Sequence, residues 1–365
     1  MKFKFLKLTQ ENINMYLIKM TADELIENYE VLRYNSQTNE NYQRPPIPAH
    51  YRKIAAYFLA ETNPILPTAI IAAVSPDHIK EEDNEIDIDS KIRIVDGQHR
   101  IEGLKALKNE YGKSGETRFN EIKEKFDFPV ILMVIDTSNE MVEIDAFINI
   151  NSKGKRVRTD LAESLKSRKR AIQNKTAEVL PVNEALISDI SLAVCRKLNT
   201  DKDSFWKGLI IQADENGNRN DQPITVVTLS QALHPLIADE LRDKNEIQKE
   251  EFEIIVGHIS ELFLNIWDLV IEKWPECFNR DKGTYDKAYN ICKGLGVIPL
   301  VNIYCELNNS IEDENALDAF QEKLRESTVK ASDWLVGGSF TGLSSGQGKT
   351  MIKQYICGEI TNIFR

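Results

Sequence analysis

The sequence predicts an α+β protein, with a mixed strand-and-helix half followed by a mainly helical half. Over residues 1–170, short apolar runs typical of buried strands alternate with segments whose apolar residues recur at helical spacing. From residue 171 onward helical spacing dominates. We therefore expect two domains, residues 1–170 and 171–365, because a chain of 365 residues can supply each with a sizeable core.

The first domain should alternate closely between strands and helices. In the segment 50–60, for example, Tyr51, Ile54, Ala55 and Phe58 share one helical face. Pro45 and Pro46 impose an extended path just before it. We expect the acidic segment 81–90 to be a surface loop and the polar region 111–116 to separate two elements. The expected strands are 14–18, 67–74, 92–95 and 128–135, and the expected helices are 22–29, 50–60, 101–107 and 140–150.

The second domain should be helical apart from two short strands joined by a turn-rich segment, 214–221. A Gly-rich segment, 342–350, resembles a P-loop in composition but has Leu343 where the first glycine of that motif should stand. We interpret it as a loop that enters the last helix. The expected strands are 207–212 and 224–228, and the expected helices are 229–244, 246–273, 285–295 and 312–330.

Composition limits the possible function classes. A net charge of −11 argues against a protein that coats nucleic acid without specificity. The first residues lack the apolar core of a signal peptide, and no segment is apolar enough to suggest a membrane span. The cysteines are odd in number and scattered, so we expect reduced thiols in a cytoplasmic protein; they are Cys195, Cys277, Cys292, Cys305 and Cys357.

The most informative segment is a strand-to-helix corner. Ile92, Ile94 and Val95 form a short apolar strand, and helical spacing resumes at Ile101. Between them, Gly97 allows close backbone approach, and His99 and Arg100 can add charged donors where the first N–H groups of a helix lack partners. Such a corner favours an anion. The alternative is an ordinary turn in which Asp96 caps the helix and Arg100 is solvated.

A second candidate is a basic run that extends to residue 170. It is either the solvated face of a helix or a contact for the phosphates of a nucleotide or of DNA. Lys153, Lys155, Arg156 and Arg158 are the candidate DNA-binding residues within it. The eight basic residues of the run are Lys153, Lys155, Arg156, Arg158, Lys166, Arg168, Lys169 and Arg170.

The segment Asp96–Arg100, in letters DGQHR, resembles the signature of the DGQHR-domain family. That family includes the B proteins of DNA phosphorothioation and of 7-deazaguanine DNA-modification systems, and its core is similar to the ParB and sulfiredoxin fold. Gln43–Pro45 resembles the first ParB box, and residues 146–155 resemble the third. Asp203–Gly208 and the pattern that begins at Ile224 are also typical of the family. The resemblance covers about residues 12–235 and implies an N-terminal domain built on a mixed sheet.

This resemblance implies a nucleoside triphosphate ligand, most simply ATP, with Mg²⁺. Gly97 and Gln98 would offer backbone N–H groups to phosphates, and Arg44 would approach from the opposite side. Asp96 would orient a water molecule or Mg²⁺, unless it only caps the helix. The implied catalytic residues are Asp96, His99 and Arg100; the implied ligand-binding residues are Arg44, Gly97, Gln98, His99, Arg100, Asn149, Asn151 and Lys155; the implied metal ligands are Asp96 and Asn149.

Two departures from the family pattern favour some of the possible functions over others. Gln98 stands where sulfiredoxin has its cysteine, which excludes sulfinic-acid reduction, and the segment 151–155 differs from the pattern of the phosphorothioation branch. The leading hypothesis is therefore an ATPase in a DNA-modification and phage-defence system, with a transglycosylase-like, base-modifying partner. The alternatives are a DNA-binding regulator of a phosphorothioation cluster and a nucleotide-gated clamp. Each of these would act as a homodimer or in a hetero-complex, without a membrane.

Overall fold

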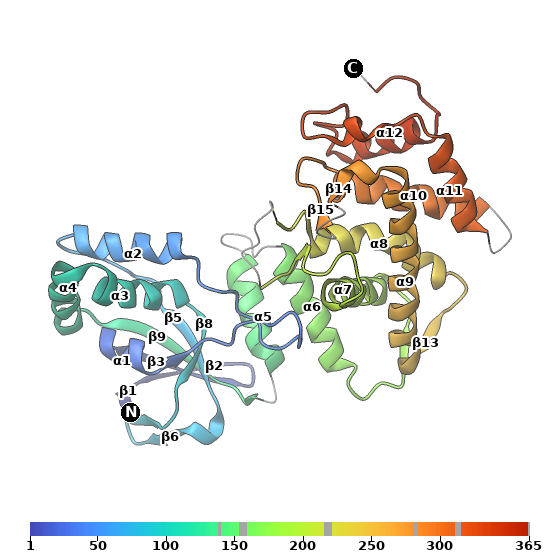
Figure 1. The fold of residues 1–365 in the computed structure, drawn as a ribbon. Coiled ribbons are helices and arrows are strands. Elements are labelled where there is room, and N and C mark those ends of the chain that lie inside the picture. Colours follow the sequence, from blue (N-terminus) through green and yellow to red (C-terminus); the bar gives the residue numbers. More distant parts are fainter. Residues whose placement is uncertain (138–139, 153–158, 215–220, 280–283, 311–314, 364–365) are drawn as a thin grey trace. The chain divides into compact units, whose positions relative to one another are not determined.

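The computed structural model describes residues 1–137, 140–152, 159–214, 221–279, 284–310 and 315–363. The chain divides into two compact units, Met1–Leu165 and Lys166–Arg365, each with a hydrophobic core of its own (Figure 1). The first is built around a mixed sheet and the second is mainly helical, which confirms the predicted α+β class.

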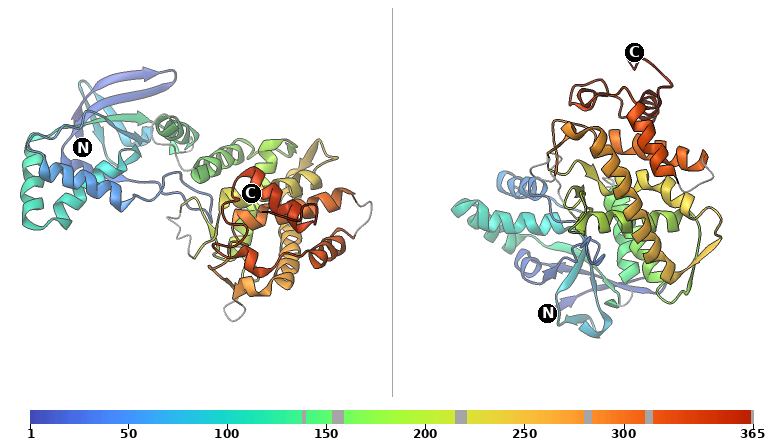
Figure 2. Two further views of the ribbon diagram at one scale, coloured as in Figure 1. Left: turned by 90° about the horizontal axis from the view of Figure 1, so that it is seen from above. Right: turned by 45° about the vertical axis from the view of Figure 1, so that its right-hand side comes forward.

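The central sheet of the first unit has six strands in the order β2-β3-β9-β5-β8-β4. Its pairs are antiparallel except β5–β9 and β4–β8, which are parallel. The hairpin of β2 and β3 forms one edge and extends as a long ribbon (dark blue in Figure 2, left). The strands are β2 (Leu6–Gln10), β3 (Ile13–Met20), β4 (Tyr29–Glu30), β5 (Ile70–Val74), β8 (Ile92–Asp96) and β9 (Phe128–Val134).

Four helices of this unit pack against one another, and residues of α2 and α3 share a core with one face of the sheet (Figure 1). Alternate strand residues, such as Ile92 and Ile94, enter that core together with Phe58 of α2 and Leu104 of α3. The helices are α1 (Ala22–Glu27), α2 (Pro48–Ala60), α3 (Gln98–Glu110), α4 (Gly112–Lys125) and, beyond β9, α5 (Glu140–Ser152).

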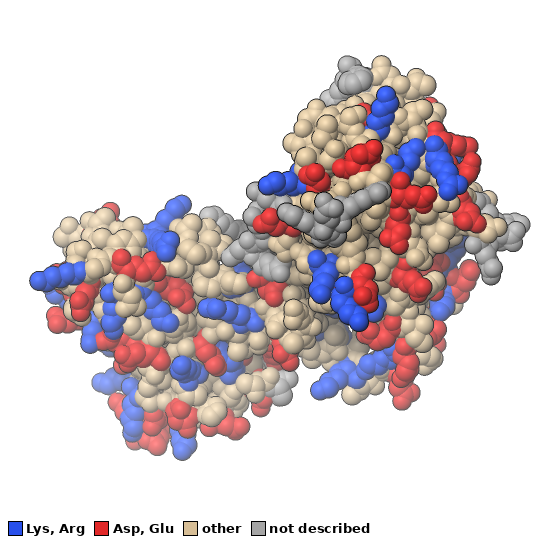
Figure 3. All heavy atoms as spheres, viewed as in Figure 1, with Lys and Arg blue, Asp and Glu red and all other residues tan. Residues whose placement is uncertain are grey.

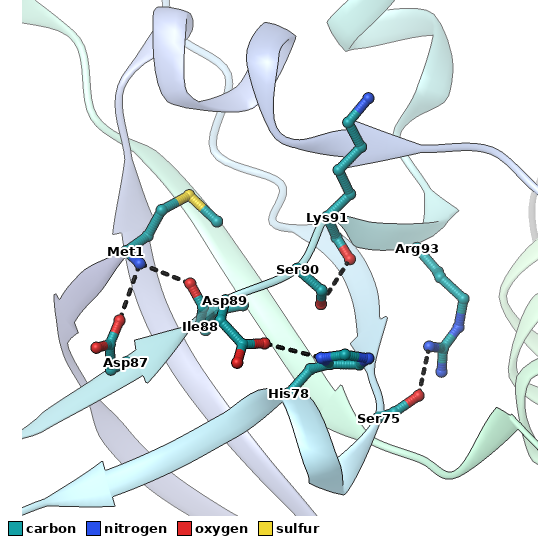
Figure 4. Close-up of polar contacts among 9 residues, drawn as sticks. All are labelled: Met1, Ser75, His78, Asp87, Ile88, Asp89, Ser90, Lys91 and Arg93. Atoms are coloured by element: carbon teal, nitrogen blue, oxygen red, sulfur yellow. Dashed lines mark hydrogen bonds and ion pairs between the residues drawn. The ribbon is translucent and has the colours of Figure 1, made fainter.

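Two expectations for this unit were wrong. The acidic segment 81–90 is not a loop throughout, because it contains most of a strand pair, β6 (Ile79–Glu82) and β7 (Glu85–Ile88), in a small sheet with β1 (Lys2–Lys4). Ile86 and Ile88 alternate with acidic residues and are buried, and the Met1 amine donates to Asp87 and to the Ile88 carbonyl (Figure 4). The polar region 111–116 separates two elements only at Tyr111, because α4 already begins at Gly112; the buried residues of α4 are Gly115, Phe119 and Ile122.

The second unit packs its helices around an aromatic core that includes Trp206, Phe263 and Trp267. Among the described residues, one helix, α9, is long and apolar enough to span a membrane. Many of its apolar side chains are nevertheless buried in this core. The helices are α6 (Thr159–Gln173), which begins in the first unit, α7 (Glu184–Thr200), α8 (Val226–Glu240), α9 (Lys249–Lys273), α10 (Gly294–Ser310), α11 (Ala316–Glu326) and α12 (Gly346–Ile356).

The strands of this unit are short, and one expected helix is absent from its expected place. Residues 285–295 contain a strand end and turns, whereas α10 begins only at Gly294 and continues through Pro299. All five cysteines are free thiols. The two-stranded ladders pair β10 (Val179–Pro181) with β13 (Glu246–Gln248), β11 (Ile210–Ile211) with β12 (Ile224–Thr225), and β14 (Phe278–Asn279) with β15 (Thr284–Tyr285).

A buried ion pair connects the sheet of the first unit to α5. Arg93 of β8 lies on the sheet face opposite Ile92 and Ile94, and its Nε and Nη2 donate to Glu143 Oε1 at 2.9 and 2.5 Å. Arg93 also donates to the Ser75 hydroxyl (Figure 4) and to the Ile135 carbonyl. The Tyr42 hydroxyl donates to the second oxygen of Glu143. The side chains of Arg93 and Glu143 are only 6% and 1% exposed, so every charge in this network depends on its partners.

We expect Arg93→Met to lower the free energy of unfolding of the first unit by about 3–5 kcal/mol, because it leaves Glu143 buried without its cation. The double variant Arg93→Met/Glu143→Leu should recover much of that loss. All four tryptophans lie in the second unit, so urea unfolding should show a shifted transition by far-UV circular dichroism and an unshifted one by tryptophan fluorescence. An unchanged dichroism transition in the single variant would contradict this role for the pair.

Candidate functional site

The corner between β8 and α3 depends on one glycine. Gly97 has φ +108° and precedes the first residue of α3, so the backbone turns from strand to helix in a conformation that side chains disfavour. A Cβ at this position would lie 3.0 Å from Ile70 Cγ1 and 3.1 Å from Arg100 Nη2. The alternative in which Asp96 caps the helix is wrong, because Gly97 is the N-cap residue and the Asp96 carboxylate turns to Arg100.

Arg100 is held by acceptors within the first unit. Its Nη1 donates to the Thr68 carbonyl and hydroxyl, and its Nη2 donates to the Ala69 carbonyl at 3.0 Å and to Asp96 Oδ2 at 2.9 Å. Burial lowers the pKa of Arg100, while Asp96 opposes that shift. Because both terminal nitrogens already donate, the guanidinium fixes the segment before β5 against the start of α3. This differs from the solvated arginine of an ordinary turn.

His99 is neutral at physiological pH. Its Nε2 accepts a hydrogen bond from the backbone N–H of Ile47 at 3.0 Å, which places the ring proton on Nδ1. Burial, followed by the positive charge of Arg44 and the neighbouring His50, lowers its pKa to about 4. The His50 ring centroid lies 5.4 Å from that of His99. His99 therefore brings a neutral donor to the corner and not the positive charge that the sequence suggested.

The segment that carries Arg44 is attached directly to the corner. Gln43 is buried, and its Nε2 donates to the carbonyls of Ile94 and Val95 at 3.0 and 2.6 Å. Gln98 in turn donates from Nε2 to the Arg44 carbonyl at 3.2 Å. The sequence prediction that places Arg44 with Gly97–Arg100 thus agrees with the described contacts. Gln98 is 6% exposed, and its Oε1 has no hydrogen-bond partner among the described residues.

The electrostatics of the corner come from few groups. Asp96 accepts from Arg100 through Oδ2, and no described residue donates to its Oδ1. The described residues contain no group of three or more His, Cys, Asp or Glu side chains that could hold a metal ion. Asp96 is the candidate metal ligand at this corner, and Glu102 is a second carboxylate, whose negative charge opposes the effect of burial on the pKa of His99.

The remaining predicted site residues belong to α5 and to the basic run. Asn149 is exposed near the end of α5. The side chain of Asn151, and Lys153, Lys155, Arg156 and Arg158, lie outside the described residues. Arg168 is buried, and Arg170 donates to both carboxylate oxygens of Asp189 on α7. On the face that Figure 3 shows, acidic and basic side chains are interspersed.

Sequence reasoning missed several residues that build this site. Ile47 supplies the N–H that sets the His99 tautomer, and Thr68 anchors Arg100; neither is of a type that indicates a site. His50 lies beside His99, and nothing near it in the sequence indicates this contact. For Arg93 a signal was present, since an arginine within an apolar strand requires a buried partner.

A family described as DndB, DNA-sulfur modification-associated, matches residues 3–185, half of the 365-residue chain. No curated protein and no solved structure matches the chain. The matched range includes the first unit from its third residue onward and therefore the whole corner. The match falls on the DNA-sulfur branch, which the sequence analysis had ranked below the 7-deazaguanine systems.

We expect Gly97→Ala to destabilise the first unit by about 1–2 kcal/mol from backbone conformation alone, and further because the new Cβ meets Ile70 and Arg100. Gly112→Ala is the matched control, since Gly112 also has positive φ, +60°, and a Cβ there would meet nothing within 4 Å. Chemical unfolding followed by circular dichroism should give the larger loss for Gly97→Ala. Equal losses would contradict a close approach at the corner.

The pKa of His99 predicts a pH dependence of stability. It is about 4 in the folded chain and about 6.5 in an unfolded one, so the unfolded chain binds the proton first as the pH falls. The stability that the neutral imidazole supports is present in full above about pH 6.5 and is lost toward pH 4. A His99→Gln variant should therefore lose less stability over this window. In NMR titrations, the ring resonance that this variant lacks should move near pH 4 and not near 6.5.

Proposed function

Because the chain belongs to the DndB family, we propose that it serves DNA-sulfur modification as a nucleotide-binding component. In this proposal the β8–α3 corner of the first unit binds a nucleoside triphosphate, ATP in the first instance, and hydrolyses it with Mg²⁺. The DNA-sulfur association rests on the family match. The nucleotide and its hydrolysis are our proposal from the chemistry of the corner and from the resemblance to the ParB and sulfiredoxin fold.

The observation that carries the proposal is the buried Oε1 of Gln98, which has no partner among the described residues. An unpaired buried acceptor costs about 1–3 kcal/mol, so such atoms are uncommon unless a water molecule or a ligand satisfies them. A nucleotide offers donors of the right kind in its ribose hydroxyls and exocyclic amino group. The first N–H groups of α3 lie next to this atom in the chain and favour a phosphate.

The described contacts suggest a division of labour among the corner residues. Arg44 supplies positive charge, as its effect on the pKa of His99 indicates, and the neutral His99 donates from Nδ1. Arg100 is a positioning residue, because its donors hold Thr68, Ala69 and Asp96. Asp96 keeps one oxygen for a water molecule or a metal ion. The catalytic roles that the resemblance assigns to His99 and Arg100 become supporting roles in this scheme.

Mg²⁺ fits a corner that offers the Asp96 carboxylate. This ion is commonly bound through one or two carboxylates together with substrate phosphates and water, so Asp96 suffices on the protein side. Asn149 remains a second proposed ligand through its amide oxygen. When bound, Mg²⁺ would neutralise charge on the phosphates. The residues of the chain would orient the triphosphate, exclude water from the buried side of the corner and hold Asp96 in place through Arg100.

The family match also changes the proposed partner. From the sequence alone, the expected partner is a base-modifying, transglycosylase-like enzyme of a 7-deazaguanine system. With the family match, we propose a protein of DNA-sulfur modification in its place, together with DNA. A second candidate function, a DNA-binding regulator of the same system, is favoured by the DNA association of the family. The ion pair of Arg170 with Asp189 counts against it, because it shows that part of the basic run serves the fold.

We expect Mg²⁺-dependent phosphate release from ATP by the full chain, and Asp96→Asn should slow it by about 10²–10³-fold if this carboxylate acts on charge in the transition state. Arg44→Ala should mainly weaken nucleotide binding. Arg52→Ala is the matched control, since Arg52 is an exposed arginine of the same unit, paired with Glu110. Circular dichroism checks that each variant is folded. The measurement is phosphate release from ATP, CTP and GTP, with and without duplex DNA.

Three outcomes would change the proposal. If nucleotide binds without turnover and drives dimerisation, the clamp is the better description. If no nucleotide binds but duplex DNA binds with a steep salt dependence, the regulator is the better description. Turnover that survives Asp96→Asn and Arg44→Ala would move the site away from the corner.

A further inference from the structure

A cavity of about 490 Å³ in the second unit suggests a second site. The first turns of three helices contribute to its lining. Thr225 and Thr228 line it at the start of α8, Gly294 and Leu295 at the start of α10, and Lys349 in the first turn of α12. The volume lies within the range of small-molecule sites. The cavity belongs wholly to this unit and includes part of the Gly-rich segment 342–350, for which the proposed function has no role.

The charge of the cavity has one sign. Lys293 and Lys349 are the ionisable residues among its described lining, which contains no carboxylate, although the chain as a whole carries a net charge of −11. Lys293 Nζ donates to Asn290 Oδ1 at 3.0 Å, and Asn290 donates to the Leu335 carbonyl, so this ammonium is held in place with donors to spare. Among the described residues, none forms a hydrogen bond or an ion pair with Lys349 Nζ. Two ammonium groups in a described lining that contains no carboxylate favour an anion.

The uncharged residues of the lining offer hydrogen-bond donors for a phosphate and, beside them, an apolar wall for an apolar group. The hydroxyls of Thr225 and Thr228 are hydrogen-bonded to each other at 2.9 Å, which leaves one hydroxyl proton to donate to a ligand oxygen. The N–H groups of Gly294 and Leu295 begin α10, where intrahelical acceptors are lacking. Ile211, Leu295 and Val336 form an apolar wall, and Val336 is 63% exposed.

We propose that this cavity binds a small phosphate-bearing molecule with an apolar portion, its phosphate held by Lys293 and Lys349. The concave shape favours such a molecule over the backbone of a DNA duplex. This site is separate from the β8–α3 corner, and its existence does not depend on the function proposed for that corner.

The test uses the full chain and phenyl phosphate, which combines a phosphate with an apolar ring and lacks the groups of a nucleotide. Phenyl phosphate should bind more tightly than inorganic phosphate, as measured by ligand-observed NMR. Lys349→Gln and Lys293→Gln should each weaken binding by about tenfold or more, the effect of one charged hydrogen bond. Lys349→Arg should retain binding. Lys202→Gln, at an exposed position of the same unit, should leave it unchanged.

Other outcomes would overturn the proposal in distinguishable ways. Binding that is absent, or that neither lysine variant weakens, rules out the cavity as the site. Binding lost in Arg44→Ala alone assigns the phosphate to the corner and leaves the proposed function intact. If phenyl phosphate does not bind but the lysine variants weaken binding of a short DNA duplex, the cavity contacts DNA phosphates and the small-molecule proposal is wrong.

Discussion

The buried pair of Arg93 and Glu143 constrains how the elements of the first unit fit together. A charge removed from water must be matched almost completely, and here the guanidinium and the carboxylate are matched by Ser75, the Ile135 carbonyl and Tyr42 as well as by each other. These partners come from β8, α5, the end of β9 and two connecting segments. Such a network selects one arrangement of these elements, because any other leaves a buried charge unpaired.

The same network also positions the candidate site, because its members lie next to the site residues in the sequence. Arg93 precedes Asp96 by three residues on β8, and Tyr42 directly precedes Gln43 and Arg44. The Tyr42 hydroxyl donates to Glu143, and the next residue, Gln43, donates to the carbonyls of Ile94 and Val95. Arg44 then lies at the start of α3, where its carbonyl accepts from Gln98. The two chain segments that form the corner are therefore held in place, because Arg93 of one and Tyr42 of the other both bond to the buried Glu143 carboxylate. Rigid placement of this kind is what a site needs to hold a ligand without paying for reorganisation.

The sequence predicted local features well and distant partners poorly. The β8–α3 corner, the strand at β9 and the helix at α2 follow from apolar spacing, which is a local property. The strand β7 was missed because acidic residues alternate with Ile86 and Ile88, and overall charge density hid the alternation. The role of Arg100 was not predictable in the same way. Whether an arginine meets phosphate or carbonyl oxygens depends on where Thr68 and Ala69 lie, and that is set by the pairing of β5 with β8.

The extent of the family match separates the two proposed sites. Residues 3–185 contain the corner, Arg44 and the Arg93–Glu143 pair, so a nucleotide at the corner is an interpretation that the whole family could share. The cationic cavity lies beyond residue 185, in helices that the match does not reach. Its chemistry therefore cannot be inherited from the family description and must be argued from its own residues. The described lining of this cavity carries two lysines and no carboxylate in a chain with excess negative charge, and positive charge on the walls of a cleft raises the local concentration of an anionic ligand.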